Sequence, residues 1–336
     1  MDLMSILSAL NNSHGPAGDE AGVRDTLRSL VEPLADEVRV DALGNLIVHR
    51  KGDGPKVMLC AHMDSIGFII THIEKEGFLR FGRLGGLHAP DLCATPVRFA
   101  NGVWGVVCVP EDADPKELKL EQLCIDVGAD SEEEVRAMGL DLGDTAVYNT
   151  TPFTAGKRIL SPYLDNRISC VVLLQVLEAL KGQPVHNDFY AVFSVQEELG
   201  LRGARTAAYA IEPDYALALD VTIADDEPGT KHSATSRLGK GAAIKVMDHS
   251  VICHPQVVSK LRELAKEGDI PAQTDIIRAG GTDAGAIHQS RGGVLTGGIS
   301  VPCRYTHTPL EMVDERDVEA CVRLATAFVQ AELPTL

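Results

Sequence analysis

Two adjacent acids close an apolar run in the middle of the chain. The run 192–195 is followed by Glu197 and Glu198, and then by a glycine at position 200. Removing a carboxylate from water is costly unless a cation or a hydrogen-bond donor compensates. Neighbouring side chains at a strand end point in different directions. One of the two acids could therefore bind a metal ion while the other moves a proton.

Four further residues of metal-binding types follow, or nearly follow, apolar runs: His62, Asp165, Asp220 and His307. An open α/β sheet gathers its ligand groups at such strand ends. Each residue taken alone has a simpler explanation. His62 and Asp64 could form a capping or surface pair, Asp165 could cap a helix, Asp220 could end a strand in a turn, and His307 could lie in a loop.

Taken together with Glu198, these four residues form a set of five candidate ligands. Two imidazoles and three carboxylates suit a pair of divalent ions such as zinc, cobalt or manganese, with one carboxylate bridging. Two ions about 3.5–4 Å apart can share and acidify a water molecule. The spare acid beside Glu198 would then remove a proton from that water as a general base.

Other catalytic motifs are weaker or missing. The chain has no Gly-x-Ser-x-Gly motif and no Gly-x-x-x-x-Gly-Lys-Ser/Thr motif, which argues against a serine nucleophile of that kind and a phosphate-binding loop. The segment 280–285 is rich in glycine and contains Gly281, Thr282 and Asp283. It is either a tight loop that approaches a substrate backbone, in which case these three residues bind substrate, or simply a turn.

The surrounding apolar pattern predicts the elements that would position these residues. Helical spacing occurs over 3–11, 20–34, 168–180, 203–211, 255–268 and 314–332, and short apolar runs occur over 56–61, 189–195 and 215–219. This alternation indicates an α/β sheet with helices on both faces. The runs 38–40 and 46–48 flank a connection that ends in Gly-Asn, which predicts a hairpin.

Residues 67–157 have a different pattern. Short strand-like runs at 68–73, 78–81, 95–99 and 103–107 are separated by Gly, Asn and Pro, which predicts a mostly β unit such as a small barrel. We therefore expect a catalytic α/β domain made of residues 1–66 and 158–336, with residues 67–157 inserted into it.

Composition narrows the class of protein. The chain has 336 residues and a formal charge of −17, and this acidity argues against a nucleic-acid partner, which requires clustered Lys and Arg. No run of about 18 apolar residues predicts a membrane span. The start of the sequence lacks a basic segment followed by a long apolar core, so we expect no signal peptide and a cytoplasmic location. The eight cysteines form no Cys-x-x-Cys pair, which argues against a zinc ribbon.

Six stretches of the sequence match a known family in order and span nearly the whole chain. The chain resembles the cytoplasmic di-metal aminopeptidases of metallopeptidase family 42, which form tetrahedral twelve-subunit particles and include glutamyl, leucyl and lysyl aminopeptidases. The matching stretches are 61–68 (AHMDSIGF), 164–167 (LDNR), 195–204 (VQEELGLRGA), 218–222 (ALDVT), 281–286 (GTDAGA) and 304–311 (RYTHTPLE).

The resemblance implies a role for each candidate residue. His62 and Asp220 would hold one ion, Glu198 and His307 the other, and Asp165 would bridge the two. Glu197 would be the general base, and Asp64 would orient the ring of His62.

The resemblance also implies a fold, an assembly and an activity. The fold would be a zinc-peptidase-like mixed sheet with helices on both faces, and the β-rich insert would be a dimerisation domain whose dimers assemble into a dodecamer. The activity would be removal of the N-terminal residue from short peptides.

Two other activities remain open at this point. A metal-dependent deacylase or amidohydrolase acting on acylated small molecules would use the same site. An endoglucanase-type glycosidase would use two acids, but it would leave His62 and His307 without a role, and only 4% of the residues are aromatic. The sequence does not indicate which side chain is preferred at the cleaved residue, because loops shape that pocket.

Overall fold

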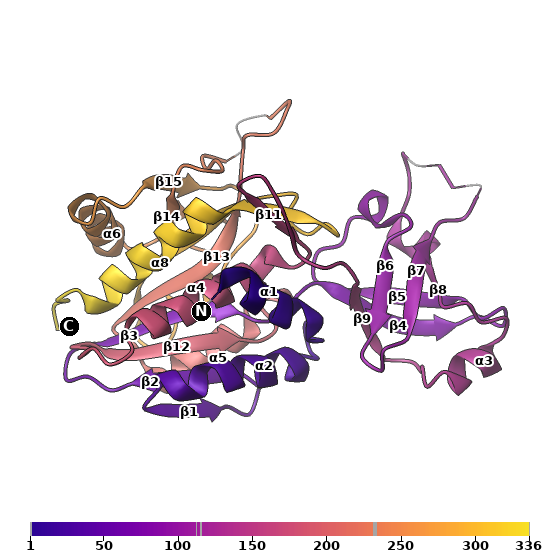
Figure 1. The fold of residues 1–336 in the computed structure, drawn as a ribbon, viewed down its shortest axis with the longest axis horizontal. Helices are drawn as coiled ribbons and strands as arrows, with labels where there is room; N and C mark the ends of the chain where they lie inside the picture. The colour runs from indigo at the N-terminus through magenta and orange to yellow at the C-terminus, as the bar shows by residue number, and fades with distance from the viewer. Residues whose placement is uncertain (1, 112, 115, 231–233, 336) are drawn as a thin grey trace.

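The computed structural model describes residues 2–111, 113–114, 116–230 and 234–335. It contains a mixed sheet of eleven strands with helices on both faces, and a closed barrel of six short strands that lies beside the sheet (Figure 1). The predicted α/β class with an inserted β-rich unit is confirmed.

Four parallel strands, in the order β12, β3, β13 and β16, form the centre of the large sheet. The remaining strands pair antiparallel to their neighbours, except that β15 runs parallel to β14. The predicted hairpin is present, with Val38 opposite Val48. The strands of the sheet are β1 (Glu37–Val40), β2 (Leu46–Arg50), β3 (Lys56–His62), β10 (Phe153–Ala155), β11 (Arg158–Ser161), β12 (Asp188–Ser194), β13 (Tyr215–Ile223), β14 (Ala242–Met247), β15 (Ala272–Ile276), β16 (Leu295–Arg304) and β17 (Glu311–Asp314).

Strand β3 shows why its sequence is almost continuously apolar. Successive side chains of a strand point to opposite faces of a sheet. Leu59 belongs to the core on one face, and its neighbours Met58 and Cys60 belong to the core on the other. Because both faces are covered, each position along the strand must be apolar.

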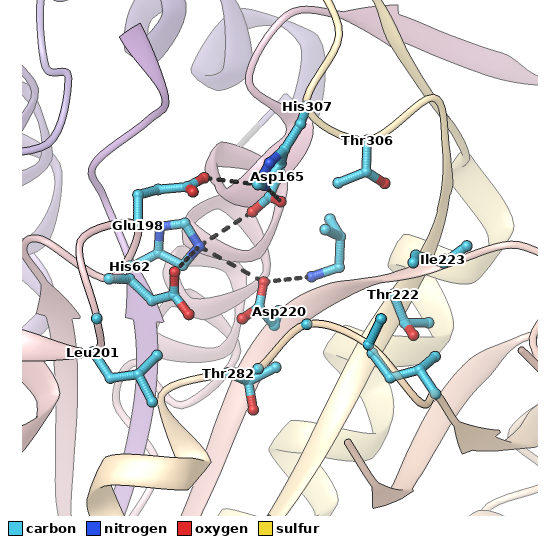
Figure 2. A pocket seen from close by; sticks show the side chains of 17 residues that line it. His62, Asp165, Glu198, Leu201, Asp220, Thr222, Ile223, Thr282, Thr306 and His307 are labelled. Carbon is cyan, nitrogen blue, oxygen red and sulfur yellow. Dashed lines mark hydrogen bonds and ion pairs between the residues drawn. The ribbon is translucent and has the colours of Figure 1, made fainter. Parts of the chain in front are cut away.

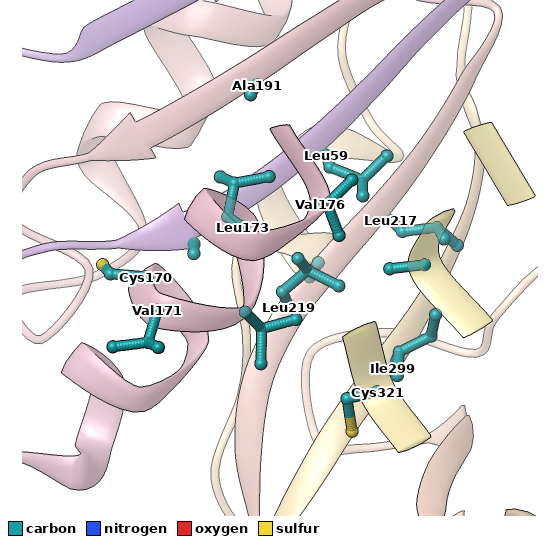
Figure 3. Packing of buried hydrophobic residues seen from close by; sticks show 14 of the residues in the cluster. Leu59, Cys170, Val171, Leu173, Val176, Ala191, Leu217, Leu219, Ile299 and Cys321 are labelled. Carbon is teal, nitrogen blue, oxygen red and sulfur yellow. The ribbon is translucent and has the colours of Figure 1, made fainter. Parts of the chain in front are cut away.

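All the helices except α3, which packs in the barrel, contribute to these two cores. Helices α1, α2, α4, α6 and α8 contribute buried side chains to the larger core, and α5 and α7 contribute to the smaller one. Figure 3 shows side chains of α4, such as Leu173 and Val176, packed against those of the central strands. The helices are α1 (Leu3–Asn12), α2 (Ala21–Val31), α3 (Glu132–Ala137), α4 (Leu164–Ala179), α5 (Arg202–Ile211), α6 (Pro255–Glu267), α7 (Ala284–Ile287) and α8 (Glu315–Gln330).

The predicted helix over 20–34 is wrong at its end. Helix α2 ends at Val31, and Glu32–Leu34 forms a single 3-10 turn. Pro33 lies in that turn, and proline has no backbone N–H with which to continue an α-helical ladder.

The barrel has a hydrophobic core of its own, which includes Phe68, Leu79, Val97 and Ile125. All four strand-like runs expected in this part of the sequence form strands, and a disulfide that the sequence did not predict joins Cys108 to Cys124 across β7 and β8. The barrel closes in the order β4-β5-β8-β7-β6-β9, with strands β4 (Gly67–Ile73), β5 (Leu79–Leu84), β6 (Pro96–Phe99), β7 (Trp104–Cys108), β8 (Cys124–Asp126) and β9 (Thr145–Tyr148).

Among the described residues, none of the helices has the length and apolar character that a membrane span requires.

Candidate metal centre

The candidate ligands meet at the carboxyl edge of the four parallel strands. His62 is the last residue of β3, and Asp220 lies near the end of β13. Glu198 follows β12, and His307 follows β16. Asp165, at the start of α4, comes from the helix that packs beneath these strand ends. The parallel arrangement therefore brings together residues that lie far apart in the sequence (Figure 2).

The five residues form two groups that share one carboxylate. In the first group, His62 Nε2 lies 3.2 Å from Asp165 Oδ1 and 3.7 Å from Asp220 Oδ1. In the second, His307 Nε2 lies 3.2 Å from Asp165 Oδ2 and 3.3 Å from Glu198 Oε1. Each oxygen of Asp165 thus faces a different histidine. The two groups have the same members as the two ligand sets that the resemblance implies.

Backbone carbonyls fix the tautomers of both histidines. Nδ1 of His62 lies 3.1 Å from the carbonyl oxygen of Asp64, and Nδ1 of His307 lies 3.1 Å from that of Gly86. A carbonyl oxygen can only accept, so each Nδ1 must carry the hydrogen. In the neutral ring, Nε2 then presents its lone pair to the shared site, as a metal ligand requires.

Two buried acids hold the backbone of the site. The Asp64 carboxylate accepts hydrogen bonds from the backbone N–H groups of Glu197 and Glu198, at 3.0 and 3.2 Å. The Glu311 carboxylate accepts from the N–H groups of Asp165 and His307, both at 2.8 Å. Each of these acids therefore fixes two residues of the candidate site at once. The Asp64 carboxylate also lies 3.5 Å from Nδ1 of His62.

Several residues next to the site have left-handed backbone angles. The φ angles of Tyr163, Gln196, Leu201 and Tyr305 are 60, 53, 58 and 60°, and that of His307 itself is 67°. Such angles are uncommon for residues other than glycine, and where they occur they often accompany functional sites. Here they let the chain turn sharply where β12 and β16 end and just before α4.

The electrostatics of the side chains at this site are dominated by carboxylates. Burial raises the pKa of Glu197 well above its usual range, and Asp220 adds to that rise while His62 opposes it. Burial disfavours charge on His307, but hydrogen bonds to Asp165 and Glu198 outweigh that effect and raise the pKa of the ring to about 12. The pKa of His62 is also raised, because nearby carboxylates outweigh its burial. Protons held by these three side chains therefore offset part of the negative charge of the carboxylates at this site.

The donor set fits a pair of divalent cations. In each group the ligand atoms lie within 4.8 Å of one another. Each group offers one imidazole and two carboxylates, and three protein ligands leave a further position open in catalytic zinc sites. The same donors suit cobalt and manganese. Cations at these positions would also offset the excess negative charge of the buried carboxylates.

Glu197 lies beside this donor set but belongs to neither group. Its Oε2 lies 3.9 Å from His62 Nε2, and its side chain borders the same cleft. The cleft has a volume of about 470 Å³. A carboxylate in this place can exchange a proton with a molecule bound in the cleft.

The glycine-rich segment is divided between the cleft and the interior. Gly281 and Thr282 line the cleft. Asp283 does not, because its side chain is buried and accepts hydrogen bonds from Ser194 Oγ at 2.5 Å and Cys60 Sγ at 3.3 Å. The structure therefore brings two of the three expected substrate-binding residues to the cleft, and it gives Asp283 a supporting place behind the end of β12.

Sequence reasoning missed Glu311 and the Gly85–Gly86 pair. An added Cβ on Gly85 would lie 2.8 Å from Glu198 Oε2, and one on Gly86 would lie 2.6 Å from His307 Nδ1. Only glycine allows this close approach of the β5 end to the site. Glu311 had a weak signal, an acid directly before the two apolar residues 312–313. The glycines had none, because their partners are distant in sequence.

Comparison with known proteins gives similarities over nearly the whole chain. A sequence model of the family described as M42 glutamyl aminopeptidase matches residues 44–324. A lysyl aminopeptidase of Pyrococcus furiosus is 38% identical over 344 residues, covering 98% of this chain and 97% of the relative.

Solved structures give the same result. An aminopeptidase from the archaeon Desulfurococcus kamchatkensis has a TM-score of 0.94 at 41% identity and covers 98% of this chain and 94% of its own. The TET1 peptidase of Pyrococcus horikoshii, described as assembling into a tetrahedron or a large octahedral shell, has a TM-score of 0.89 at 31% identity. That match covers 99% of this chain and 100% of the neighbour.

Proposed function

The chain belongs to the M42 glutamyl aminopeptidase family, and from this premise we propose that it works with two divalent metal ions at the centre described above. The family and these relatives make the protein a hydrolase that removes the N-terminal residue from peptides. The observation that supports two ions, rather than one, is the division of the ligands into two groups that share Asp165.

The residues of each group would hold one ion. His62 and Asp220 would bind the first, His307 and Glu198 the second, and Asp165 would use one oxygen for each. Zinc and cobalt suit these donors best, and manganese is the third candidate. When bound, the two ions supply Lewis-acid chemistry, which makes a water molecule more acidic and a carbonyl carbon more electrophilic.

Glu197 carries the proton in this proposal. It lies beside His62 of the first group and belongs to neither group, so its carboxylate remains free to take a proton from the attacking water. It then gives that proton to the departing amine, so that one residue serves as base and then as acid. Asp64 positions Glu197 through its backbone and positions His62 through the histidine ring.

The cleft suits a peptide with a free amino terminus. Its acidic lining residues are Asp165, Glu197, Glu198 and Asp220, and an ammonium group is attracted to such a negative field. Gly281 and Thr282 also line the cleft, so their loop backbone can approach the substrate chain. Asp283 would assist only indirectly, through Ser194.

One assay separates this function from the deacylase alternative. Protein stripped with a chelator would be reloaded with zinc, cobalt or manganese and offered leucyl-anilide and N-acetyl-leucyl-anilide, with N-acetyl-leucine as the deacylase substrate. We expect metal-dependent release of the anilide from the free amine only. Release of acetate would favour the deacylase instead. Activity on a β-glucan that survives the chelator would favour the glycosidase, which neither the family nor these relatives support.

We also propose that the chain forms homo-oligomers, as dimers that assemble into a dodecamer. The TET1 peptidase of Pyrococcus horikoshii is described as assembling into a tetrahedron or a large octahedral shell. The barrel of this chain exposes large apolar side chains, including Trp104 at 63% and Leu142 at 55%, which suit a buried interface. Sedimentation of the native chain and of Trp104→Ser tests this, and a monomeric native chain would contradict it. The cytoplasmic location stays a prediction for cell fractionation.

A further inference from the structure

One part of the cleft lining, next to Asp220, is apolar, and we call it the apolar wall. Leu201 lies on one side of Asp220, and Ile223 lies on the other (Figure 2). Ile277 and Val221 also line this part of the cleft. Ile277 is 6% exposed, and Ile223 is 44% exposed. An incoming side chain therefore meets aliphatic carbon next to the metal centre.

Two of the three threonines that line the cleft, Thr222 and Thr282, have already used their hydroxyl donors. Thr222 Oγ1 donates to Asp275 Oδ1 at 2.8 Å, and Thr282 Oγ1 donates to Asp248 Oδ2 at 3.0 Å. Both carboxylates are buried beneath the cleft. Neither hydroxyl hydrogen is left to bind a carboxylate of a substrate.

No Lys or Arg side chain lines the cleft among the described residues. Arg304 Nε is paired with Asp226 Oδ1 at 2.6 Å, and Arg202 donates to Gln196 Oε1 at 3.1 Å. Lys245 lies behind the wall, where its Nζ is 2.6 Å from Asp275 Oδ2. A glutamate side chain in this cleft would be desolvated without a cationic partner among the described residues, which is costly.

The lysine side chain of a lysyl substrate would also lack a partner of its own in this cleft. All the acidic residues among the described lining belong to the candidate centre, namely Asp165, Glu197, Glu198 and Asp220. The wall of Leu201, Val221, Ile223 and Ile277 offers no additional carboxylate for a second ammonium group.

We propose that this cleft selects peptides whose N-terminal residue has an uncharged aliphatic side chain, such as leucine or methionine. The proposal rests on the aminopeptidase function and names the substrate class for the same site. Burial of a leucine-sized side chain against this wall favours its substrate by a factor of about ten or more. We therefore expect kcat/KM for leucyl substrates to exceed that for glutamyl and lysyl substrates by at least about tenfold.

The test uses metal-loaded full-length protein with leucyl-, methionyl-, glutamyl- and lysyl-anilides. The variant Ile223→Arg places a cation in the wall and should raise the glutamyl-to-leucyl ratio of kcat/KM by about tenfold or more, since a paired charge removes the desolvation cost. Ile252→Arg is the matched control, because Ile252 is 76% exposed and lies outside the cleft. Its ratio should equal that of the native protein.

Faster cleavage of glutamyl or lysyl than of leucyl substrates by the native protein would overturn the proposal and leave the aminopeptidase function intact. If no anilide is cleaved with any of the three metals, the function itself fails. Calorimetric measurement of the binding of free L-leucine and L-glutamate to the metal-loaded protein then still tests the side-chain preference of the cleft. Tighter binding of L-glutamate would contradict an aliphatic preference.

Discussion

Asp64 holds the backbone of Glu197, with its Oδ1 3.0 Å from the Glu197 nitrogen. Its other oxygen accepts from the backbone of Glu198, and its own carbonyl oxygen lies 3.1 Å from Nδ1 of His62. One buried residue thus fixes the proposed base, one proposed ligand of the second ion and one proposed ligand of the first. The sequence had linked Asp64 only to His62.

This relationship predicts the effect of Asp64→Asn. The asparagine side chain has one acceptor oxygen, so its amide group would face one of the two backbone N–H groups. A buried unpaired donor costs about 1–3 kcal/mol, and residues that orient metal ligands typically affect metal affinity or activity by about 10–100-fold. We expect a fall of that size in kcat/KM for leucyl-anilide, with the fold retained by circular dichroism. Asp53→Asn, at an exposed position, is the control, and equal activity of the two variants would remove this role from Asp64.

Glu311 predicts a defect in metal binding. Its two oxygens accept from the N–H groups of Asp165 and His307, and Glu311→Gln leaves one of them facing an amide. We expect lower metal occupancy after dialysis, because the shared carboxylate and one histidine lose their fixed positions. Metal-to-protein ratios by elemental analysis give the readout. The exposed Glu315→Gln is the control, and full occupancy in both variants would contradict the prediction.

We expect the Glu→Gln substitution to change the metal content at one of the two adjacent glutamates and not at the other. Glu197→Gln removes the proton carrier but no ligand, so kcat should fall by about 10²–10⁴-fold while the metal content stays unchanged. Glu198→Gln removes a carboxylate of the second group, so this variant should bind less metal. Elemental analysis and leucyl-anilide turnover on both proteins check the pair. Normal turnover in Glu197→Gln would rule out its role as the base.

The raised pKa of His307 predicts that metal binding releases protons. In the metal-free protein that pKa is raised from 6.5 to about 12, so the folded chain keeps a proton at neutral pH that the unfolded chain loses. The resulting stabilisation is complete below about pH 6.5 and is lost as the pH rises toward 12. A metal ion requires the neutral ring, so its apparent affinity should increase with pH.

Calorimetry gives the number of protons released. Titration of zinc into stripped protein near neutral pH, in two buffers of different ionisation enthalpy, should give different apparent enthalpies. The metal-free protein should in turn unfold more easily as the pH increases above about 6.5. Identical enthalpies in the two buffers would mean that the histidines are already neutral.

The ion pairs of Lys245 with two buried acids lead us to expect that this lysine stabilises both the fold and the apolar wall of the cleft. Its Nζ lies 2.6 Å from Asp275 Oδ2 and 4.0 Å from Asp248 Oδ2, and these two acids hold Thr222 and Thr282. Lys245→Met would leave both acids uncompensated, at a cost of about 3–5 kcal/mol in the free energy of unfolding.

The substrate readout is the Michaelis constant. Without Lys245, the carboxylates of Asp275 and Asp248 would no longer be held in place as acceptors for Thr222 and Thr282. The KM for leucyl-anilide should then increase more than kcat falls. Lys260→Met is the control, since the partly exposed pair of Lys260 with Glu263 should contribute under about 1 kcal/mol. Equal unfolding midpoints in urea for the two variants would contradict the stability prediction.

The sequence indicated the candidate ligands because each follows an apolar run, and parallel strands bring such ends together. His62 and Asp220 are the clearest cases, since both belong to the parallel strands β3 and β13. Asp165 could be interpreted only through its neighbours, because an acid at a helix start is usually a cap. The predicted fold class is confirmed for the same reason: alternating apolar patterns report which faces are buried.

Contacts between distant residues escaped prediction. Nothing near Gly86 in the sequence indicates that its carbonyl oxygen meets His307, 221 positions away. The apolar wall was also hidden, because Leu201, Ile223 and Ile277 come from three separate segments that only the folded sheet brings together. Periodicity reports local geometry, whereas these contacts depend on how loops turn after the strands end.

Through the contact of Gly86 with His307, the barrel helps to hold a side chain of the candidate site in place. A chain cut down to its α/β portion would lose the carbonyl that sets the tautomer of His307, together with the close packing of Gly85 against Glu198. Movement of the barrel relative to the sheet would displace His307 and Glu198, the proposed ligands of the second ion. A barrel taken from another protein would therefore have to reproduce this two-glycine contact before the hybrid could hold the two proposed ions.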